Sequence, residues 1–173
     1  PGGRGARRPG AFPLAASAAG VLVRDEQTLR EGRSLVSSIT TDSWRRYVDP
    51  GAPVVEPDEA GRTLAAIARD HDLTVFAHFD TDYVGHRGSM GEAIAAIELV
   101  DQFLGALAEA LDPGTLLVAT SDHGNLEDTT VGHTANPVPL LALGRGSDYL
   151  ARRVQAISDL TPAILELLQD DSE

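Results

Sequence analysis

The chain has 173 residues, and 42% of them are hydrophobic, which is enough for one buried core. Its net charge is −12, because it contains 26 acidic residues and 14 basic ones. Every basic residue is Arg, and such an acidic chain repels nucleic acid and anionic membranes, so neither is expected as a partner. The absence of Cys excludes disulfides and thiolate ligands, so a metal would be held by His and oxygen donors. No apolar run approaches the roughly 20 residues of a membrane span, and a cytoplasmic protein is expected.

The first third of the sequence gives weak structural signals. Residues 1–13 are rich in Gly, Pro and Arg, which predicts a disordered segment. Residues 14–56 are expected to form a helix and loop region that joins from an N-terminal half missing from this sequence. Within it we expect a helix over 25–36 and a loop over 37–55, in which Trp44 is a packing residue.

A clearer pattern follows. Apolar spacing predicts a helix from Pro57 to about Asp70, a buried strand over 73–79, and a polar loop over 80–88. Ser89 and Glu92 have the spacing of a capping box, which indicates that a long helix begins there. The residues expected on the buried face of that helix are Ala93, Ile97, Val100, Leu104, Leu107 and Leu111.

Two further strands are expected over 115–119 and 139–144, and a closing helix over 163–168 that Thr161 and Pro162 introduce. The alternation of helices and strands predicts an α/β fold, with a mainly parallel sheet and helices on both faces. We expect residues 57–173 to form this domain and to bind metal.

Five polar residues follow the ends of the expected strands. Asp82 and His86 come after the first, Asp122 and His123 after the second, and His133 precedes the third. Neighbouring parallel strands would bring these loops together at one edge of the sheet. Carboxylates and imidazoles without thiolate suit Zn²⁺, Mn²⁺ or Fe, and the set is large enough for two ions about 4 Å apart, which would stabilise a displaced phosphoryl group.

Each of these residues alone is more often a turn former or a surface group. Three of the five His residues in matched loops favour a shared site over that interpretation. The other two have ordinary interpretations, His71 at a helix end and His78 as a core or interface residue. Arg87 is a candidate for gripping a substrate phosphate, although an exposed Arg more often forms a surface ion pair.

At these residues the chain resembles the alkaline phosphatase superfamily, and most closely the cofactor-independent phosphoglycerate mutases. The motifs are Asp82-x-x-Gly-His86, Ser121-Asp-His-Gly-Asn125 and His133-Thr-Ala-Asn-Pro-Val-Pro139, in that order. Val100-Asp101 and the segment 159–168 extend the resemblance, which covers about residues 73 to 168. The pair His86-Arg87 is also similar to phosphopentomutases, whereas Asn136-Pro137 favours phosphoglycerate mutase.

The resemblance implies two divalent metal ions, Mn²⁺ or Zn²⁺. Asp82, His86 and His133 would hold one, and Asp122 and His123 the other. In the family a Ser or Thr nucleophile near the first strand takes up the phosphoryl group and passes it to a hydroxyl or to water, and an early Asp completes the second metal's coordination.

This sequence departs from the family pattern in two respects. It has no recognisable nucleophile motif before residue 73, and no motif supports Thr41 or Ser43 in that role. The mutases also use an active-site Lys, which this sequence lacks.

The expected function is therefore metal-dependent phosphoryl transfer or hydrolysis of a small phosphorylated substrate. The alternatives are a non-catalytic metal-binding fragment without the nucleophile, and a phosphodiesterase or sulfatase-like hydrolase of the same superfamily.

Overall fold

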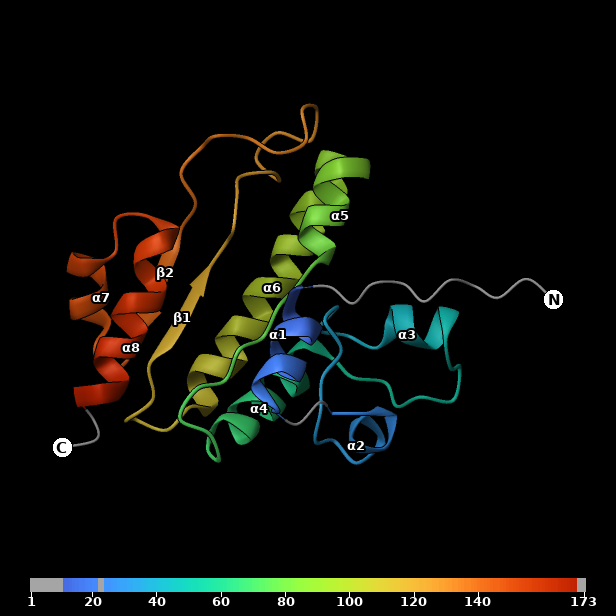
Figure 1. Ribbon diagram of the computed structural model, residues 1–173. Coiled ribbons are helices and arrows are strands. Elements are labelled where there is room, and N and C mark those ends of the chain that lie inside the picture. Colours follow the sequence, from blue (N-terminus) through green and yellow to red (C-terminus); the bar gives the residue numbers. More distant parts are fainter. Residues whose placement is uncertain (1–10, 22–23, 171–173) are drawn as a thin grey trace.

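The computed structural model describes residues 11–21 and 24–170. Within these ranges the regular structure is mostly helical (Figure 1). The predicted disordered segment lies largely outside them, and its residues 11–13 belong to the first helix. In chain order the elements are α1 (Ala11–Ala19), α2 (Glu26–Arg30), α3 (Asp42–Tyr47), α4 (Pro57–Ala68), α5 (Asp80–Arg87), α6 (Met90–Ala110), β1 (Leu117–Thr120), β2 (Leu140–Leu143), α7 (Ser147–Arg153), the 3₁₀ turn η1 (Ile157–Asp159) and α8 (Leu160–Asp170).

Helices α4 and α6 pack closely and form most of the core. Pro57 occupies the first turn of α4, where its missing N–H costs no hydrogen bond. Gly61 permits the close approach, since a Cβ there would lie 2.6 Å from the Phe103 carbonyl oxygen. The buried residues of this core are Ile39, Ala60, Ala65, Phe103 and Leu107.

The long helix α6 begins as predicted. The Ser89 N–H donates to Glu92 Oε2 at 2.7 Å, and the Glu92 N–H donates to Ser89 Oγ at 3.4 Å, so the capping box is confirmed. The predicted apolar face is only partly right: Ala93 and Leu107 are buried, but Ile97 is 51% exposed. Val100, Leu104 and Leu111 also pack against the core as predicted, and Phe103, outside the predicted stripe, is buried as well, so the packed face is wider than predicted.

The sheet contains two strands in the described part of the chain, and they run antiparallel. Leu117 pairs with Leu143 and Thr120 with Leu140. The expectation of a mainly parallel sheet is therefore wrong for these strands. Parallel neighbours need a crossover, usually a helix, whereas residues 121–139 form a long loop without one, and the chain returns beside β1 in the opposite direction.

The strand expected over 73–79 is also wrong, because this extended segment joins no ladder. It packs through side chains instead: the Phe76 ring lies 5.4 Å from that of Phe103. Leu73, Val75 and Phe79 are more than half exposed. An apolar, β-branched run therefore gave an extended backbone here, but no strand.

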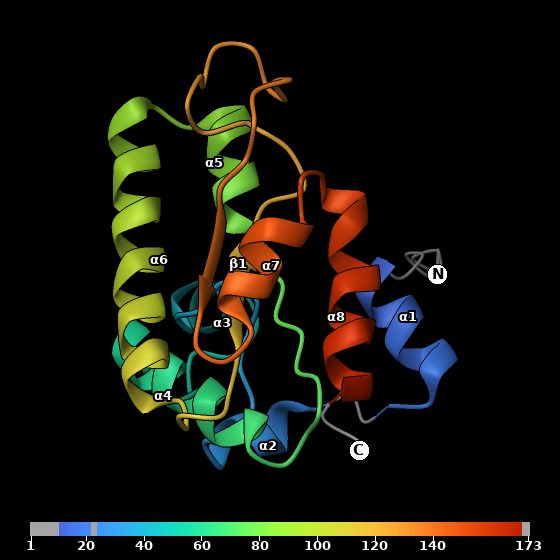
Figure 2. The ribbon, with the colours of Figure 1, turned by 90° about the vertical axis from the view of Figure 1, so that its left-hand side faces the viewer.

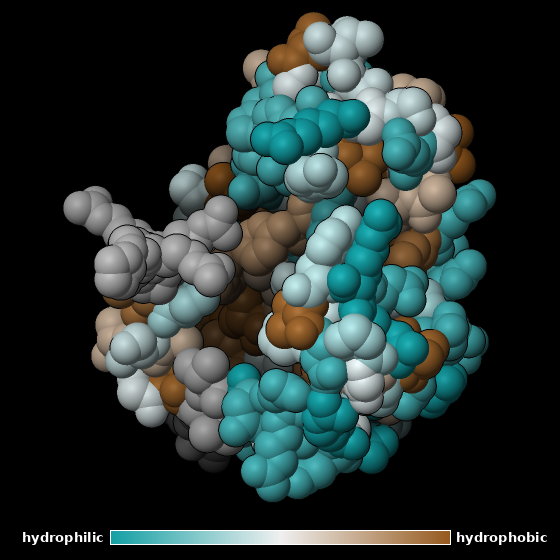
Figure 3. All heavy atoms as spheres, turned by 90° about the vertical axis from the view of Figure 1, so that its right-hand side faces the viewer, coloured by the Kyte–Doolittle hydropathy of each residue, from teal (hydrophilic) through white to brown (hydrophobic). Residues whose placement is uncertain are grey.

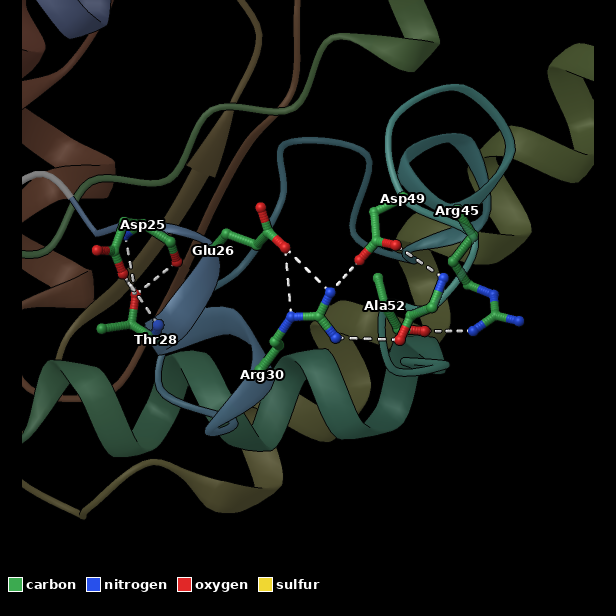
Figure 4. Close-up of polar contacts among 8 residues, drawn as sticks. Asp25, Glu26, Thr28, Arg30, Arg45, Asp49 and Ala52 are labelled. Atoms are coloured by element: carbon green, nitrogen blue, oxygen red, sulfur yellow. Dashed lines mark hydrogen bonds and ion pairs between the residues drawn. The ribbon is translucent and has the colours of Figure 1, made fainter.

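The region before α4 contains shorter helices than predicted. The helix expected over 25–36 is shorter in the structure and consists of α2 alone. It ends early because Gly32, two residues after α2, has a φ of +66°, which a right-handed helix cannot include. The loop expected over 37–55 contains α3. Arg30 joins α2 to the chain just after α3, since its guanidinium contacts Glu26 in its own helix and Asp49, two residues beyond the end of α3 (Figure 4).

Trp44 lies in α3 and is half-buried. Together with residues of α2 it lines a shallow cavity, and its indole Nε1 is shielded from solvent without a hydrogen-bond partner among the described residues. The prediction that Trp44 is a packing residue agrees with this placement.

Helices lie on both sides of the two-stranded sheet, as expected. Figures 1 and 2 show the sheet between α6 on one side and α7 with α8 on the other. The closing helix α8 includes all of the predicted 163–168. On the face shown in Figure 3, hydrophobic side chains gather in a hollow, while most of the remaining surface there is hydrophilic. None of the described helices is long and apolar enough to cross a membrane.

Candidate metal centre

Helix α5 presents Asp82 and His86 on one face, because residues four apart are neighbours on a helix. The prediction of a loop over 80–88 is wrong. Asp80 and Asp82 lie in the first turn and His86 and Arg87 in the last, and this order of charges stabilises a helix through its dipole. That charge order was the missed sequence signal.

The loop 121–139 supplies the other side chains. Thr134 N donates to Gly124 O at 2.8 Å, and these two residues form an isolated antiparallel bridge. A side chain on Gly124 would run into the Thr134 hydroxyl, so a larger residue does not fit the bridge. The bridge places His123 beside His133, and their rings stack with centroids 3.6 Å apart.

Helix α5 and the loop meet at the upper end of the molecule in both ribbon views (Figures 1 and 2). There Asp82 Oδ1 lies 3.2 Å from His133 Nε2 and 3.4 Å from His86 Nε2. The two imidazole nitrogens are 2.9 Å apart. The ligand atoms of Asp82, His86 and His133 thus face one point.

Asp122 and His123 lie at the edge of this group. His123 Nε2 is 3.9 Å from Asp82 Oδ1 and 3.5 Å from Asp122 Oδ1. The Asp122 side chain is 78% exposed and the His123 side chain 28%. His123 therefore connects Asp122 to the cluster, and all five predicted residues occupy one region.

The geometry of the three central residues fits a metal ion. Ligand atoms about 2.0–2.1 Å from a tetrahedral zinc lie about 3.3 Å from one another, and the three separations here are 2.9, 3.2 and 3.4 Å. A neutral imidazole with its hydrogen on Nδ1 has a lone pair on Nε2, so in that tautomer both facing nitrogens can bind a cation. The donor set of two nitrogens and one oxygen suits Zn²⁺ or Mn²⁺.

The sequence did not point to Glu127, which organises the loop. Its carboxylate accepts hydrogen bonds from Asn125 N at 2.8 Å, from Asn136 Nδ2 at 3.0 Å and from the Thr134 hydroxyl. The Thr134 contact, with Asn136 and backbone N–H groups, lowers the pKa of Glu127 to about 2. Glu127 and Asp128 stand together in a segment of Gly, Asn and Thr residues, so the sequence alone did not distinguish the two acids.

The remaining polar candidates lie outside the cluster. Arg87 is exposed, and its guanidinium lies 5.3 Å from the centre of the Tyr83 ring on the same helix. His71 follows α4, where its Nε2 is 3.5 Å from an Arg24 nitrogen. His78 is partly buried, with Nδ1 2.7 Å from the Ser37 carbonyl oxygen, as expected for a packing residue.

Neither hydroxyl considered as a nucleophile reaches the cluster. Thr41 is buried, and its hydroxyl donates to Pro53 O and accepts from Val55 N, which is a structural role. Ser43 lies in α3, which both ribbon views place away from the loop above α5.

Comparison with known families identifies the relationship. The sequence model of the Metalloenzyme superfamily matches residues 53–171. The chain belongs to this superfamily. The match begins just before α4 and ends after α8, so it includes both segments of the candidate metal centre.

The curated relatives named 2,3-bisphosphoglycerate-independent phosphoglycerate mutase are much longer than the chain. The protein from Paracoccus denitrificans is 35% identical over 69% of this chain and 25% of its own length. One from Cereibacter sphaeroides is 38% identical over 65% of this chain and 24% of the relative, and one from Gloeothece citriformis is 32% identical over 80% and 29%. The chain thus spans about a quarter of these relatives. No solved structure matches it.

Proposed function

We propose that the chain carries the metal-binding part of a phosphoryl-transfer enzyme similar to cofactor-independent phosphoglycerate mutase. Asp82, His86 and His133 hold one divalent ion, Mn²⁺ or Zn²⁺, and Asp122 with His123 contributes to a second. The observation that carries the proposal is the convergence of one carboxylate oxygen and two imidazole nitrogens within 3.4 Å of one another.

The chemistry follows from charge. A pair of divalent ions lowers the pKa of a bound hydroxyl and neutralises the oxygens of a transferring phosphoryl group. The residues of this chain fix the positions of the ligand atoms: α5 aligns Asp82 with His86, and the Gly124–Thr134 bridge aligns His123 with His133. Arg87, one residue beyond His86, is proposed to contact a substrate phosphate. The proposed setting is the cytoplasm, and the fold needs no oxidising compartment, since the sequence has no Cys to form a disulfide.

Metal binding tests the proposal directly. We expect the unaltered chain to bind Mn²⁺ in isothermal titration calorimetry, and His133→Ala to weaken binding by about tenfold or more through the loss of a ligand. His71→Ala is the matched control, because His71 lies outside the cluster. A folded chain that binds neither Mn²⁺ nor Zn²⁺ would overturn the proposal.

A second candidate is a metal-binding fragment without catalysis. It is favoured by the hydroxyls near the site, which have other partners: Ser121 Oγ donates to the His123 carbonyl oxygen at 2.8 Å, and the Thr134 hydroxyl donates to Glu127. Hydrolysis of a generic phosphate monoester with added Mn²⁺ separates the two candidates. Turnover that Asp82→Ala abolishes supports the enzyme, and metal binding without turnover supports the fragment.

A further inference from the structure

Glu127 lies in the loop between two of the proposed ligands, His123 and His133, and contacts the chain next to each. Its Oε2 accepts from the backbone N–H of Asn125, two residues after His123. Its Oε1 accepts from the side chains of Thr134 and Asn136, which follow His133. One carboxylate therefore connects the two sides of the loop.

The backbone supplies only a narrow connection at the same place. Gly124 and Thr134 form an isolated bridge with one hydrogen bond of 2.8 Å, from Thr134 N to Gly124 O. Beyond this bridge the chain runs to residue 139 before the ladder with β2 begins. A single bridged pair fixes a loop weakly, because it orders many residues for one bond.

The charge of Glu127 strengthens the connection between the two sides of the loop that the Gly124–Thr134 bridge also makes. Hydrogen bonds to an ionised carboxylate are stronger than those between neutral groups, and here both oxygens accept. Glu127 is ionised at neutral pH, and these hydrogen bonds to the charged form lower its pKa to about 2, so it stays ionised in mild acid as well. With both oxygens occupied, Glu127 stabilises the loop and is not itself an obvious ligand.

We propose that Glu127 is a positioning residue, which holds His123 and His133 side by side and thereby sets the affinity of the site for its divalent ion. The part that concerns metal rests on the proposed function, whereas the positioning of the two histidines does not. The stacked rings, 3.6 Å apart, are the geometry that Glu127 maintains.

Its neighbour Asp128 provides a matched control. The Asp128 carboxylate accepts from Thr130 N at 3.0 Å and from Thr130 Oγ1, so it stabilises a local turn within two residues. It carries the same charge in the same loop but does not join the two histidine-bearing segments. Comparing Glu127→Ala and Glu127→Gln with Asp128→Asn therefore separates the effect of connecting the two segments from the effect of removing one negative charge from the loop.

The first measurement uses the metal-free protein. Hydrogen–deuterium exchange followed by NMR should show the Asn125 and Thr134 amides exchanging at least tenfold faster in Glu127→Ala than in the unaltered chain. In Asp128→Asn both exchange rates should stay within about threefold of those in the unaltered chain. The exchange rates of α6 amides should be the same in every variant, which would show that the fold is intact. Unchanged exchange at Asn125 and Thr134 in Glu127→Ala would overturn the proposal.

The second measurement is the Mn²⁺ dissociation constant. Loss of a group that orients ligands typically weakens metal binding by about 10- to 100-fold, and we expect this of Glu127→Ala. Glu127→Gln should be intermediate, because its amide oxygen still accepts from Asn125 N. Unaltered affinity in Glu127→Ala would overturn the metal-affinity part. If the unaltered chain binds no Mn²⁺, the proposed function fails, and the exchange measurement still decides whether Glu127 positions the loop.

Discussion

Asn125 packs its side-chain amide directly against the backbone of Gly85, so that a Cβ on Gly85 would overlap the Asn125 oxygen. Both residues are buried, and Asn125 is only 6% exposed. The contact joins α5 to the loop 121–139, the two segments that carry the proposed ligands. Glycine is required at position 85 because of this approach, and not for an unusual backbone angle.

Gly85→Ala should separate the two segments and weaken Mn²⁺ binding by about tenfold or more. The same substitution should lower the free energy of unfolding by about 1–3 kcal/mol, the usual cost of overpacking. Titration calorimetry and thermal unfolding measure these effects. Gly91→Ala is the control, since a Cβ there meets only Ser89 Oγ, at 3.9 Å. Equal metal affinity in the two variants would contradict the structural role of Gly85.

The two carboxylates of the candidate metal centre should differ in their effect on the number of bound metal ions. Asp82 Oδ1 lies within 3.9 Å of three imidazole nitrogens, whereas among the described residues Asp122 forms an ion pair with one imidazole, that of His123. We expect the Asp122→Asn variant to retain one tightly bound ion. The Asp82→Asn variant should bind that same ion with an affinity lower by about tenfold or more. Mass spectrometry under native conditions counts the ions. Asp80→Asn, on the same helix, should bind like the unaltered chain, and loss of both ions in Asp122→Asn would contradict two separable sites.

Arg87 should affect phosphate binding and leave metal binding unchanged. Arg87→Ala is expected to weaken the binding of inorganic phosphate to the Mn²⁺-loaded protein by about tenfold, since a charged hydrogen bond contributes roughly 1.5–3 kcal/mol. Arg46 is a matched control because its guanidinium also lies over a tyrosine, 5.2 Å from the ring centre of Tyr47. If Arg46→Ala weakens phosphate binding equally, the effect belongs to net charge and not to the site.

The loop should loosen in acid through Glu127. Its pKa is depressed from 4.5 to about 2, so its contribution to stability is fully present above pH 4.5 and is lost as the pH falls through about 2. NMR titration of the Glu127 side-chain carbon should give a midpoint near 2. Thr134→Ala removes the largest cause of the shift and should move the midpoint up toward 4.5. A midpoint near 4.5 in the unaltered chain would contradict the hydrogen bonding described here.

The proximity of the five polar residues was predictable from the sequence, although the expected cause, neighbouring parallel strands, was wrong. Asp122 and His123 do follow a strand, but Asp82 and His86 follow an extended segment outside the sheet and lie on a helix. The loop reaches them by folding back at the Gly124–Thr134 bridge, and not by lying beside a parallel strand. Spacing in the sequence thus indicated which polar residues lie close together better than it indicated the sheet.

The rest of the fold was predictable where the signal was local. The capping box at Ser89 and the proline at position 57 mark their helices correctly, because each acts within a single turn. Strand direction depends on what the chain does between residues 120 and 140, for which periodicity gives no signal. Glu127 was missed for the same reason: its partners Thr134 and Asn136 are up to nine residues away, and only the folded loop brings them together.

The position of Trp44 has a practical consequence for spectroscopy. It is the sole tryptophan of the sequence, and it lies in α3 beside the cavity formed with α2. Its fluorescence will therefore follow the melting of the region that precedes the superfamily match, while events among the histidines go unseen. An optical assay of ion uptake needs a reporter introduced on α5 or in the loop above it.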